Sequence, residues 1–148
     1  MKTGEACNRT VIVVDRDTSL GEAASLMREH HVGSLVVVEQ GDGRVPVGIV
    51  TDRDMVVEVF ATDLDHRTIK VGEIMGATLV TAREEDDSLD TLKLMRAHGV
   101  RRIPVVTAKG ELAGIITVDD LLEIVAEQLH DIVRAIGNEQ SREGARRP

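Results

Sequence analysis

Apolar residues along this chain follow two periods, one typical of strands and one typical of helices. Four short runs rich in β-branched residues are bounded by polar turns, which predicts strands. They are "SLVVVE" (34–39), "VGIVT" (47–51), "RIPVVT" (102–107) and "AGIIT" (113–117). A shorter signal of the same kind precedes each pair, "TVIVV" (10–14) and "TLVTA" (78–82). The pattern therefore predicts three strands in each half of the chain.

Residues at helical spacing separate the first predicted strand of each half from the second. In the first half the helical face consists of Leu20, Ala23, Ala24, Met27 and His31, and in the second of Leu89, Leu92 and Met95. Ser19 and Glu22 have the spacing of a capping box at the start of the first helix. Leu20 precedes Met27 by seven residues, whereas Leu89 precedes Met95 by six. We therefore expect the two helix starts to differ by one residue.

The two halves repeat each other. "LMREHHVGSLVVVE" (26–39) aligns with "LMRAHGVRRIPVVT" (94–107), and "GIVTDRD" (48–54) aligns with "GIITVDD" (114–120). The two-residue change in spacing falls in the turn between these segments, where insertions cost least. Each half reads βαββα, so the predicted fold class is α/β (α+β), with the repeats packed about a pseudo-twofold axis.

The repeat predicts a division of the chain into four parts. Residues 1–65 form the first repeat, 66–77 a connector, 78–136 the second repeat and 137–148 a disordered tail, where periodicity fades. The connector includes "VGEIM" (71–75), a candidate helical turn, and the last helix is expected from about residue 119 to 136. A half of some 65 residues is marginal alone, so packing the halves together is first of all a structural solution.

Composition narrows the functional classes. The net charge of −8 disfavours contact with a nucleic-acid backbone, and aromatic residues are only 1%. Any flat base must therefore be held by aliphatic side chains. Cys7 is the single cysteine, the N-terminus carries no apolar signal segment, and no apolar run approaches membrane-spanning length. We expect a cytoplasmic protein. No histidine or cysteine spacing matches a zinc site, and no known catalytic motif occurs.

The repeated Gly-x-x-Thr-x-x-Asp motif has two interpretations. Thr51 and Asp54, like Thr117 and Asp120, lie where a strand ends and a helix begins. Threonine at the N-cap with an acid three residues later is a capping box, which taken alone is the more frequent role. A helix N-terminus also attracts phosphate, and an acid there can accept both hydroxyls of a ribose. The two roles are compatible.

The ordered set of segments over residues 10–128 resembles a pair of CBS domains, named after cystathionine β-synthase. "DTSLGEAASLMREHHVGSLVVVE" with "VGIVTDRD", and "DDSLDTLKLMRAHGVRRIPVV" with "GELAGIITVDDLL", carry the resemblance. It implies a module with two clefts between its halves that binds adenosine-containing ligands, such as AMP, ADP, ATP or S-adenosylmethionine. It also implies a homodimer and a separate effector protein. In the family the Asp of the motif holds the ribose, and the Thr contacts ribose or phosphate.

The resemblance extends to a set of candidate ligand-binding residues. The base would lie against the start of each middle strand, read by backbone groups, although the apolar side chains there are also core candidates. Arg53, Arg101 and Arg102 could contact phosphates across the interface between halves, whereas the alternative for Arg53 is a surface ion pair with Asp52 or Asp54. The candidates are Val32, Gly33, Ser34, Leu35, Thr51, Arg53, Asp54, Val100, Arg101, Arg102, Ile103, Pro104, Thr117 and Asp120.

The resulting functional expectation is a non-catalytic sensor of adenine nucleotides. No cofactor is required, and the nucleotide acts as a regulatory ligand, with or without Mg²⁺. The alternatives are a ligand-free dimerisation or scaffold module, then nucleic-acid binding through arginine-rich segments, and last a nucleotide hydrolase.

Overall fold

The computed structural model describes residues 1–41 and 43–147, so Asp42 and Pro148 lie outside the described residues. The first half contains β1 (Val13–Val14), α2 (Leu20–His30), β2 (Ser34–Val38), β3 (Pro46–Thr51), α3 (Asp52–Met55) and the π-helix η1 (Val56–Phe60). The second contains β4 (Ala82–Arg83), α5 (Ser88–His98), β5 (Arg102–Val106), β6 (Leu112–Thr117) and α6 (Val118–Arg146). Three short helices complete the chain: α1 (Thr3–Ala6), η2 (His66–Thr68) and α4 (Val71–Ile74). The predicted α/β fold with two repeats is confirmed.

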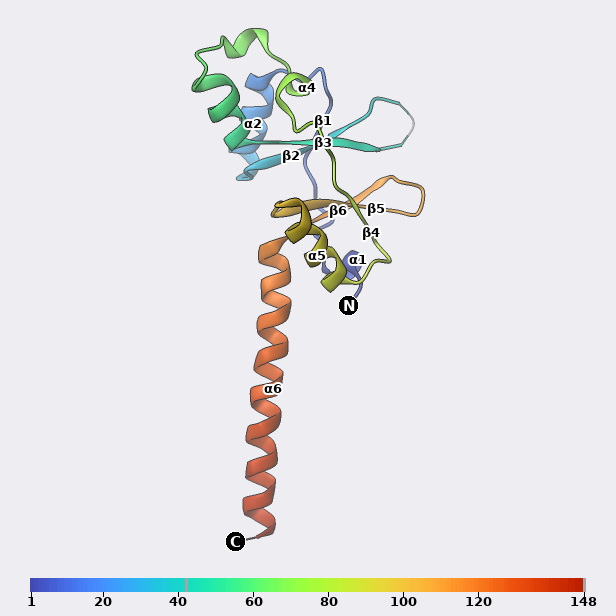
Figure 1. Ribbon diagram of the computed structural model, residues 1–148, viewed down its shortest axis with the longest axis vertical. Helices are drawn as coiled ribbons and strands as arrows, with labels where there is room; N and C mark the ends of the chain where they lie inside the picture. Colours follow the sequence, from blue (N-terminus) through green and yellow to red (C-terminus); the bar gives the residue numbers. More distant parts are fainter. Residues whose placement is uncertain (42, 148) are drawn as a thin grey trace.

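Each half has a three-stranded mixed sheet, ordered β1-β2-β3 in the first and β4-β5-β6 in the second. The first pair in each sheet is parallel and the second is antiparallel. The registers correspond, since Ser34 pairs with Thr51 and Arg102 pairs with Thr117. The two sheets lie next to each other at the centre of the molecule, with α2 and α5 on their outer sides (Figure 1). The start of the middle strand is thus adjacent to the Thr of its own repeat.

The middle strands are buried on both faces. Leu35 and Val37 belong to the apolar cluster beneath α2, whereas Val36 points to the opposite face and is also buried. In the second half Ile103 and Val105 belong to the cluster beneath α5, and Pro104 is buried on the other face. Because both faces of these strands are covered, the sequence reads as a continuous apolar run rather than as an alternation.

The starts of the two long helices correspond more closely than their leucines suggest. Helices α2 and α5 each have 11 residues, and their first residues, Leu20 and Ser88, are 68 positions apart. The expected difference of one residue was wrong, because Ser88, only 4% exposed, occupies the buried place of Leu20. At the start of α2, the Ser19 side chain accepts a hydrogen bond from the amide of Glu22, which is one half of the predicted capping box.

The N-terminal segments of the two repeats are exchanged. Helix α1, at the start of the chain, packs on the second half, where the amide of Thr3 donates to the carbonyl of Asp86. Helix α4 instead packs on the first half, where the amide of Val71 donates to the carbonyl of Thr18. The predicted turn at 71–75 is confirmed. Figure 1 shows the chain running from α1 to β1 in one direction and from α4 to β4 in the other.

Helix α6 is the largest departure from the predicted pattern. It continues to Arg146, whereas the periodicity predicted an end near residue 136 and a disordered tail beyond it. Arg96, His98 and Gly99 end α5 in the usual way, with Gly99 in the left-handed region at φ 64°. Gly137 and Asn138 follow Ile136, but both lie inside α6, so the backbone continues as a helix after its apolar face has ended.

Candidate functional site: a cavity between the repeats

Both Thr-x-x-Asp motifs form reciprocal capping boxes. Thr51 Oγ1 accepts a hydrogen bond from the amide of Asp54 at 3.1 Å, and Asp54 Oδ2 accepts one from the amide of Thr51 at 2.9 Å. Thr117 and Asp120 repeat these bonds with the same distances. The capping interpretation is confirmed. It leaves the hydroxyl proton of each Thr free to be donated, because the hydroxyl oxygen only accepts in the cap.

A cavity of about 400 Å³ brings the first of these motifs against the second repeat. From the first repeat it is lined by Thr51, Asp52, Arg53 and Asp54 together with Ile49. From the second repeat it is lined by Gly76, Thr78, Leu79, Val80, Gly99, Val100, Arg101 and Arg102. This volume lies within the range of small-molecule sites, roughly 300–1,000 Å³. Six of the proposed ligand-binding residues, three from each repeat, therefore meet in one cavity.

The charged residues that line the cavity are three arginines, Arg53, Arg101 and Arg102, and two acids, Asp52 and Asp54. No ion pair involving Arg53 or Arg102 is found within the described part of the chain, so the alternative role of Arg53, a surface ion pair with Asp52 or Asp54, is not observed. Arg101 lies 3.9 Å from Asp119, but both side chains are more than three-quarters exposed, so solvent screens this pair. The cavity is thus a locally cationic place in a chain of net charge −8.

The backbone amides at this helix start are already occupied. The amide of Asp52 donates to the carbonyl of Gly33 at 3.0 Å, that of Arg53 to the carboxylate of Asp52, and that of Asp54 to Thr51. A phosphate would therefore find its donors in the arginine side chains and the Thr51 hydroxyl rather than in free helix amides.

The remaining candidates lie outside this cavity. Val32, Gly33 and Ser34 are at the start of β2 in the first repeat, and Leu35 is buried in the core. Ile103 and Pro104 are also buried, so their side chains serve packing. Thr117 and Asp120 form the equivalent junction in the second repeat.

The second junction differs from the first in charge. The residue in the place of Arg53 is Asp119, and Gly33 and Ser34 take the places of Arg101 and Arg102. No Lys or Arg thus occupies any of the three cationic positions. Cys7 lies beside this junction, where a Cβ on Gly114 would be 2.7 Å from its sulfur. Burial raises the pKa of the Cys7 thiol, and the charges of Glu84 and Asp120 also raise it against the opposing effect of Arg9.

Seven residues of the cavity were absent from the sequence-based candidates: Ile49, Asp52, Gly76, Thr78, Leu79, Val80 and Gly99. The sequence carried a signal for four of them, Gly76, Thr78, Leu79 and Val80. They belong to a repeated segment, because "KTGEACNRTVIV" (2–13) aligns with "KVGEIMGATLVT" (70–81) at the same 68-residue offset. The expected strand over 78–82 is shortened to Ala82–Arg83, and the expected strand over 10–14 is likewise shortened to Val13–Val14. Thr78, Leu79 and Val80, which precede β4, line the cavity.

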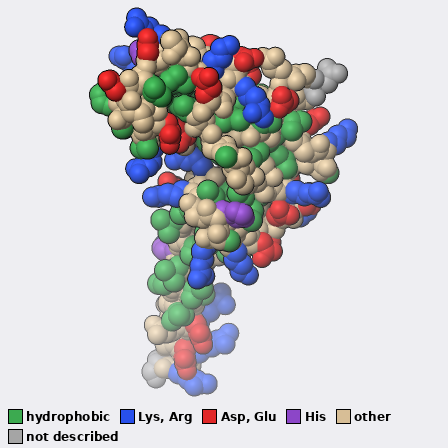
Figure 2. All heavy atoms as spheres, turned by 45° about the horizontal axis from the view of Figure 1, so that its top comes forward, with side chains coloured by type: hydrophobic (Ala, Val, Ile, Leu, Met, Phe, Trp, Pro, Cys, Tyr) green, Lys and Arg blue, Asp and Glu red, His purple; other side chains and the backbone are tan. Residues whose placement is uncertain are grey.

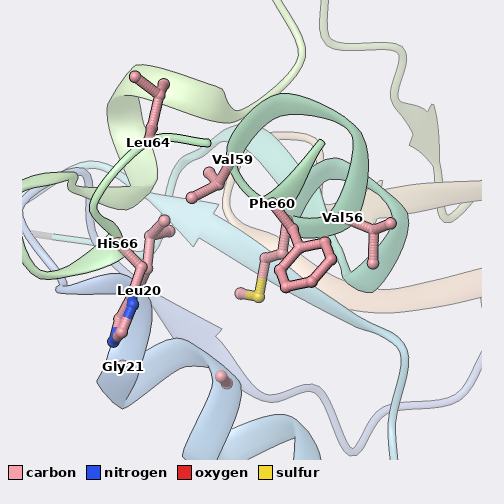
Figure 3. Close-up of a pocket in the computed structure, with 9 residues that line it drawn as sticks. Leu20, Gly21, Val56, Val59, Phe60, Leu64 and His66 are labelled. Atoms are coloured by element: carbon pink, nitrogen blue, oxygen red, sulfur yellow. The ribbon is translucent and has the colours of Figure 1, made fainter. Parts of the chain in front are cut away.

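A second cavity lies in the first repeat between α2 and η1 (Figure 3). Its lining is almost entirely apolar and includes Leu20, Val56, Val59 and Phe60. Among the residues that line it, only His66 has side-chain nitrogen atoms that can donate or accept a hydrogen bond. This cavity suits contact with apolar side chains and lacks the charges that a nucleotide would need.

The described residues contain no group of three or more His, Cys, Asp or Glu side chains placed to hold a metal ion. Within the same residues, no helix combines the length and the apolar character that crossing a membrane requires.

Comparison with known proteins decides the family. The CBS domain family matches residues 4–61 and 71–127. The chain belongs to the CBS domain family. The CBS domain-containing protein YhcV of Bacillus subtilis is 39% identical over 111 residues, which cover 75% of this chain and 76% of YhcV. The uncharacterized protein MK0525 of Methanopyrus kandleri is 35% identical over 124 residues, covering 84% of this chain but only 62% of that relative.

Solved structures share the arrangement of the two CBS repeats. An uncharacterized conserved protein from Pyrococcus horikoshii is 32% identical with a TM-score of 0.73, covering 84% of this chain and 91% of that one. The CBS domain pair of protein MJ0100 was solved in complex with 5′-methylthioadenosine and S-adenosyl-L-methionine. It is 23% identical with a TM-score of 0.73, covering 84% and 99%, a likeness that establishes the fold alone.

Proposed function

We propose that this protein is a non-catalytic regulatory module that binds a phosphorylated adenosine in the cavity between its two CBS repeats. The observation that carries the proposal is the meeting of the Thr51–Asp54 capping box with Arg101 and Arg102 of the other repeat around one cavity. A ligand seated there contacts both repeats. Its binding can therefore change how they pack, and a ligand shifts such an equilibrium by its differential affinity for the two states.

The ribose is assigned to the capping box. Asp54 uses Oδ2 for the cap, and within the described chain no hydrogen bond reaches its Oδ1. This second oxygen can accept from the 2′- and 3′-hydroxyls. The free hydroxyl proton of Thr51 can be donated to a sugar or phosphate oxygen.

The base and the phosphates are assigned to different residues of the lining. Ile49, Leu79 and Val80 offer aliphatic surfaces for a base in a protein with 1% aromatic residues. Arg53, Arg101 and Arg102 can form charge-assisted hydrogen bonds with phosphate oxygens. Such bonds favour AMP, ADP or ATP over a sulfonium compound. The MJ0100 complex with two adenosyl compounds supports the nucleoside class for the family.

The test measures binding of AMP, ADP, ATP, GTP and S-adenosylmethionine, with and without Mg²⁺, by thermal shift and then by calorimetry. A ligand at a hundredfold excess over Kd adds about 2.7 kcal/mol of stability. For a chain of this length that raises the midpoint of unfolding by about 5–10 °C. We expect the adenosine phosphates to give the largest rise.

Asp54→Asn is the deciding variant, and Asp120→Asn is its matched control in the second repeat. Asparagine keeps the size and one cap acceptor, so folding should survive. Loss of a hydrogen bond to a charged group costs about 1.5–3 kcal/mol, or roughly 10- to 100-fold in affinity. Asp120→Asn should leave affinity at this cavity within about twofold. Wild-type titration by Asp54→Asn would remove the ribose assignment, and response to no ligand would favour a scaffold module.

A further inference from the structure

Helix α6 leaves the body of the protein after its first two turns. Leu121 is its last buried residue, and every residue from Val125 to Arg147 is exposed. Figure 1 shows the helix projecting from the second repeat with nothing beside it. An isolated helix is only marginally stable in water, and most helical stability in proteins comes from packing an apolar face. The projecting part of α6 therefore lacks the packing that normally holds a helix.

An apolar stripe runs along this projecting part. It consists of Leu122, Val125, Leu129, Ile132 and Ile136, whose side chains are between 41% and 63% exposed. Successive members are three, four, three and four residues apart, which is the heptad spacing of helices that pair side by side. Apolar side chains gather along the upper part of the projecting helix, with charged ones beyond them (Figure 2).

The positions that flank the stripe are uncharged. They are Ala126, Gln128, Val133 and Ala135. In paired helices these flanking positions usually carry Glu or Lys and choose the partner by charge. Because these side chains are small or neutral, a second helix can approach closely. Their lack of charge favours neither a parallel nor an antiparallel orientation of that helix. The choice between orientations must come from the rest of the helix.

Charge is distributed unequally between the two ends of α6. Residues 118–131 contain five acidic residues and no Lys or Arg, a net charge of −5. Residues 132–147 contain four arginines and two glutamates, a net charge of +2. In a parallel pair of two such helices, the acidic end of one helix would lie beside the acidic end of the other, and the two basic ends would also lie side by side. In an antiparallel pair, the acidic end of each helix lies beside the basic end of the other.

We propose that α6 is an interaction surface for a second copy of this chain, and that the two helices pair antiparallel through the stripe. With Leu129 level with Ile132 of the second copy, Val125 lies level with Ile136 of that copy. The two bodies then lie at opposite ends of the pair. The last buried residue of one helix is level with residue 140 of the other, about 28 Å away from its counterpart along the axis. Four apolar layers are covered in this arrangement, and Arg142 lies beside the acidic start of the facing helix.

The first test breaks the stripe and measures molar mass by light scattering after gel filtration. In the full chain, Leu129→Glu with Ile132→Glu places charges at the centre of the pair. The molar mass should fall by half, while the thermal unfolding of the body is unchanged because both residues are exposed. The matched control, His130→Glu with Ser141→Glu, adds the same number of acids away from the stripe and should keep the wild-type mass. A monomeric wild type, or an unchanged mass for the first variant, overturns the proposal.

The second test determines orientation by disulfide formation in a Cys7→Ser background. Val125→Cys and Ile136→Cys are made singly, then mixed and oxidised gently. The antiparallel pair predicts covalent dimers for the mixture and almost none for either variant alone. Covalent dimers of Val125→Cys with itself would show a parallel pair and overturn the assigned orientation.

Discussion

At the scale of single residues, the two repeats solve the same packing problem with different chemistry. Thr3 and Thr91 are fully buried between α1 and α5, and their Oγ1 atoms are 2.7 Å apart. The corresponding positions in the first repeat are Val71 and Ala23, both completely buried and in one apolar cluster. One repeat thus joins its exchanged segment by a hydroxyl pair, and the other does so by apolar contact alone.

We expect Thr3→Val to lower the free energy of unfolding by about 1–3 kcal/mol, because the Thr91 hydroxyl is left buried without a partner. The double variant Thr3→Val with Thr91→Val should recover most of this loss, since both polar groups are then removed. Urea denaturation of the wild type, both single variants and the double variant measures the coupling. Additive losses would show that the two hydroxyls do not depend on each other.

The mirror variant in the first repeat is Val71→Thr. It places a hydroxyl opposite Ala23 within an apolar cluster and should cost a similar amount. A neutral Val71→Thr would mean that this site admits water or a backbone acceptor.

At the scale of elements, each exchanged segment closes over the glycine of the Gly-x-x-Thr-x-x-Asp motif. A Cβ on Gly48 would lie 2.7 Å from the sulfur of Met75, and one on Gly114 would lie 2.7 Å from the backbone oxygen of Asn8. The second approach is fixed by an antiparallel bridge, in which Asn8 and Ile115 exchange hydrogen bonds of 2.9 Å. Glycine is needed in both motifs for close contact between segments rather than for contact with a ligand.

Gly114→Ala and Gly48→Ala should therefore differ. A methyl group at 114 meets backbone and must displace residues 7–8, so we expect a loss of about 1–3 kcal/mol and faster amide exchange in residues 2–9. At 48 the neighbour is the end of a flexible methionine, which can move at a cost below about 1.5 kcal/mol. Hydrogen exchange followed by mass spectrometry compares the two variants. Equal effects would indicate that the bridge at Asn8 yields as easily as Met75.

At the scale of the whole molecule, the cavity exists only because the repeats are packed together. Thr51 and Asp54 come from one repeat, and Arg101 and Arg102 from the other. The two junctions share the same caps but differ in charge, with Asp119 in the place of Arg53. The proposed preference for phosphorylated ligands therefore belongs to the first junction alone.

Arg102→Ala should weaken the binding of adenosine phosphates roughly 10-fold or more, with a loss that grows from AMP to ATP and shrinks at high salt. Adenosine itself should bind as it does to the wild type. Calorimetric titration with all four ligands at two salt concentrations measures this, and Arg96→Ala on the outer helix α5 is the control. An equal loss for adenosine and ATP would assign Arg102 to the shape of the cavity instead of to its charge.

The predictions succeeded where the determinants are local. The four longer strands and the capping boxes at Thr51 and Thr117 follow from period and cap chemistry. They did not include the packing of Thr3 and Val71, although the offset of 68 residues that relates these two positions is present in the chain. They also ended α6 too early, because the helix continues through Gly137 and Asn138 after its apolar stripe has ended.

What the sequence determined alone is the repeat itself: two copies of one βαββα unit, each with a Thr-x-x-Asp cap and an apolar middle strand. These features depend on neighbours within a few residues, so periodicity and residue type are sufficient to specify them. Only the tertiary structure decided that α1 and α4 change places, and that Thr51 and Asp54 line one cavity with Arg101 and Arg102 of the other repeat. That choice is made when two half-covered sheets bury their remaining apolar faces against each other, a contact between segments that no local pattern encodes.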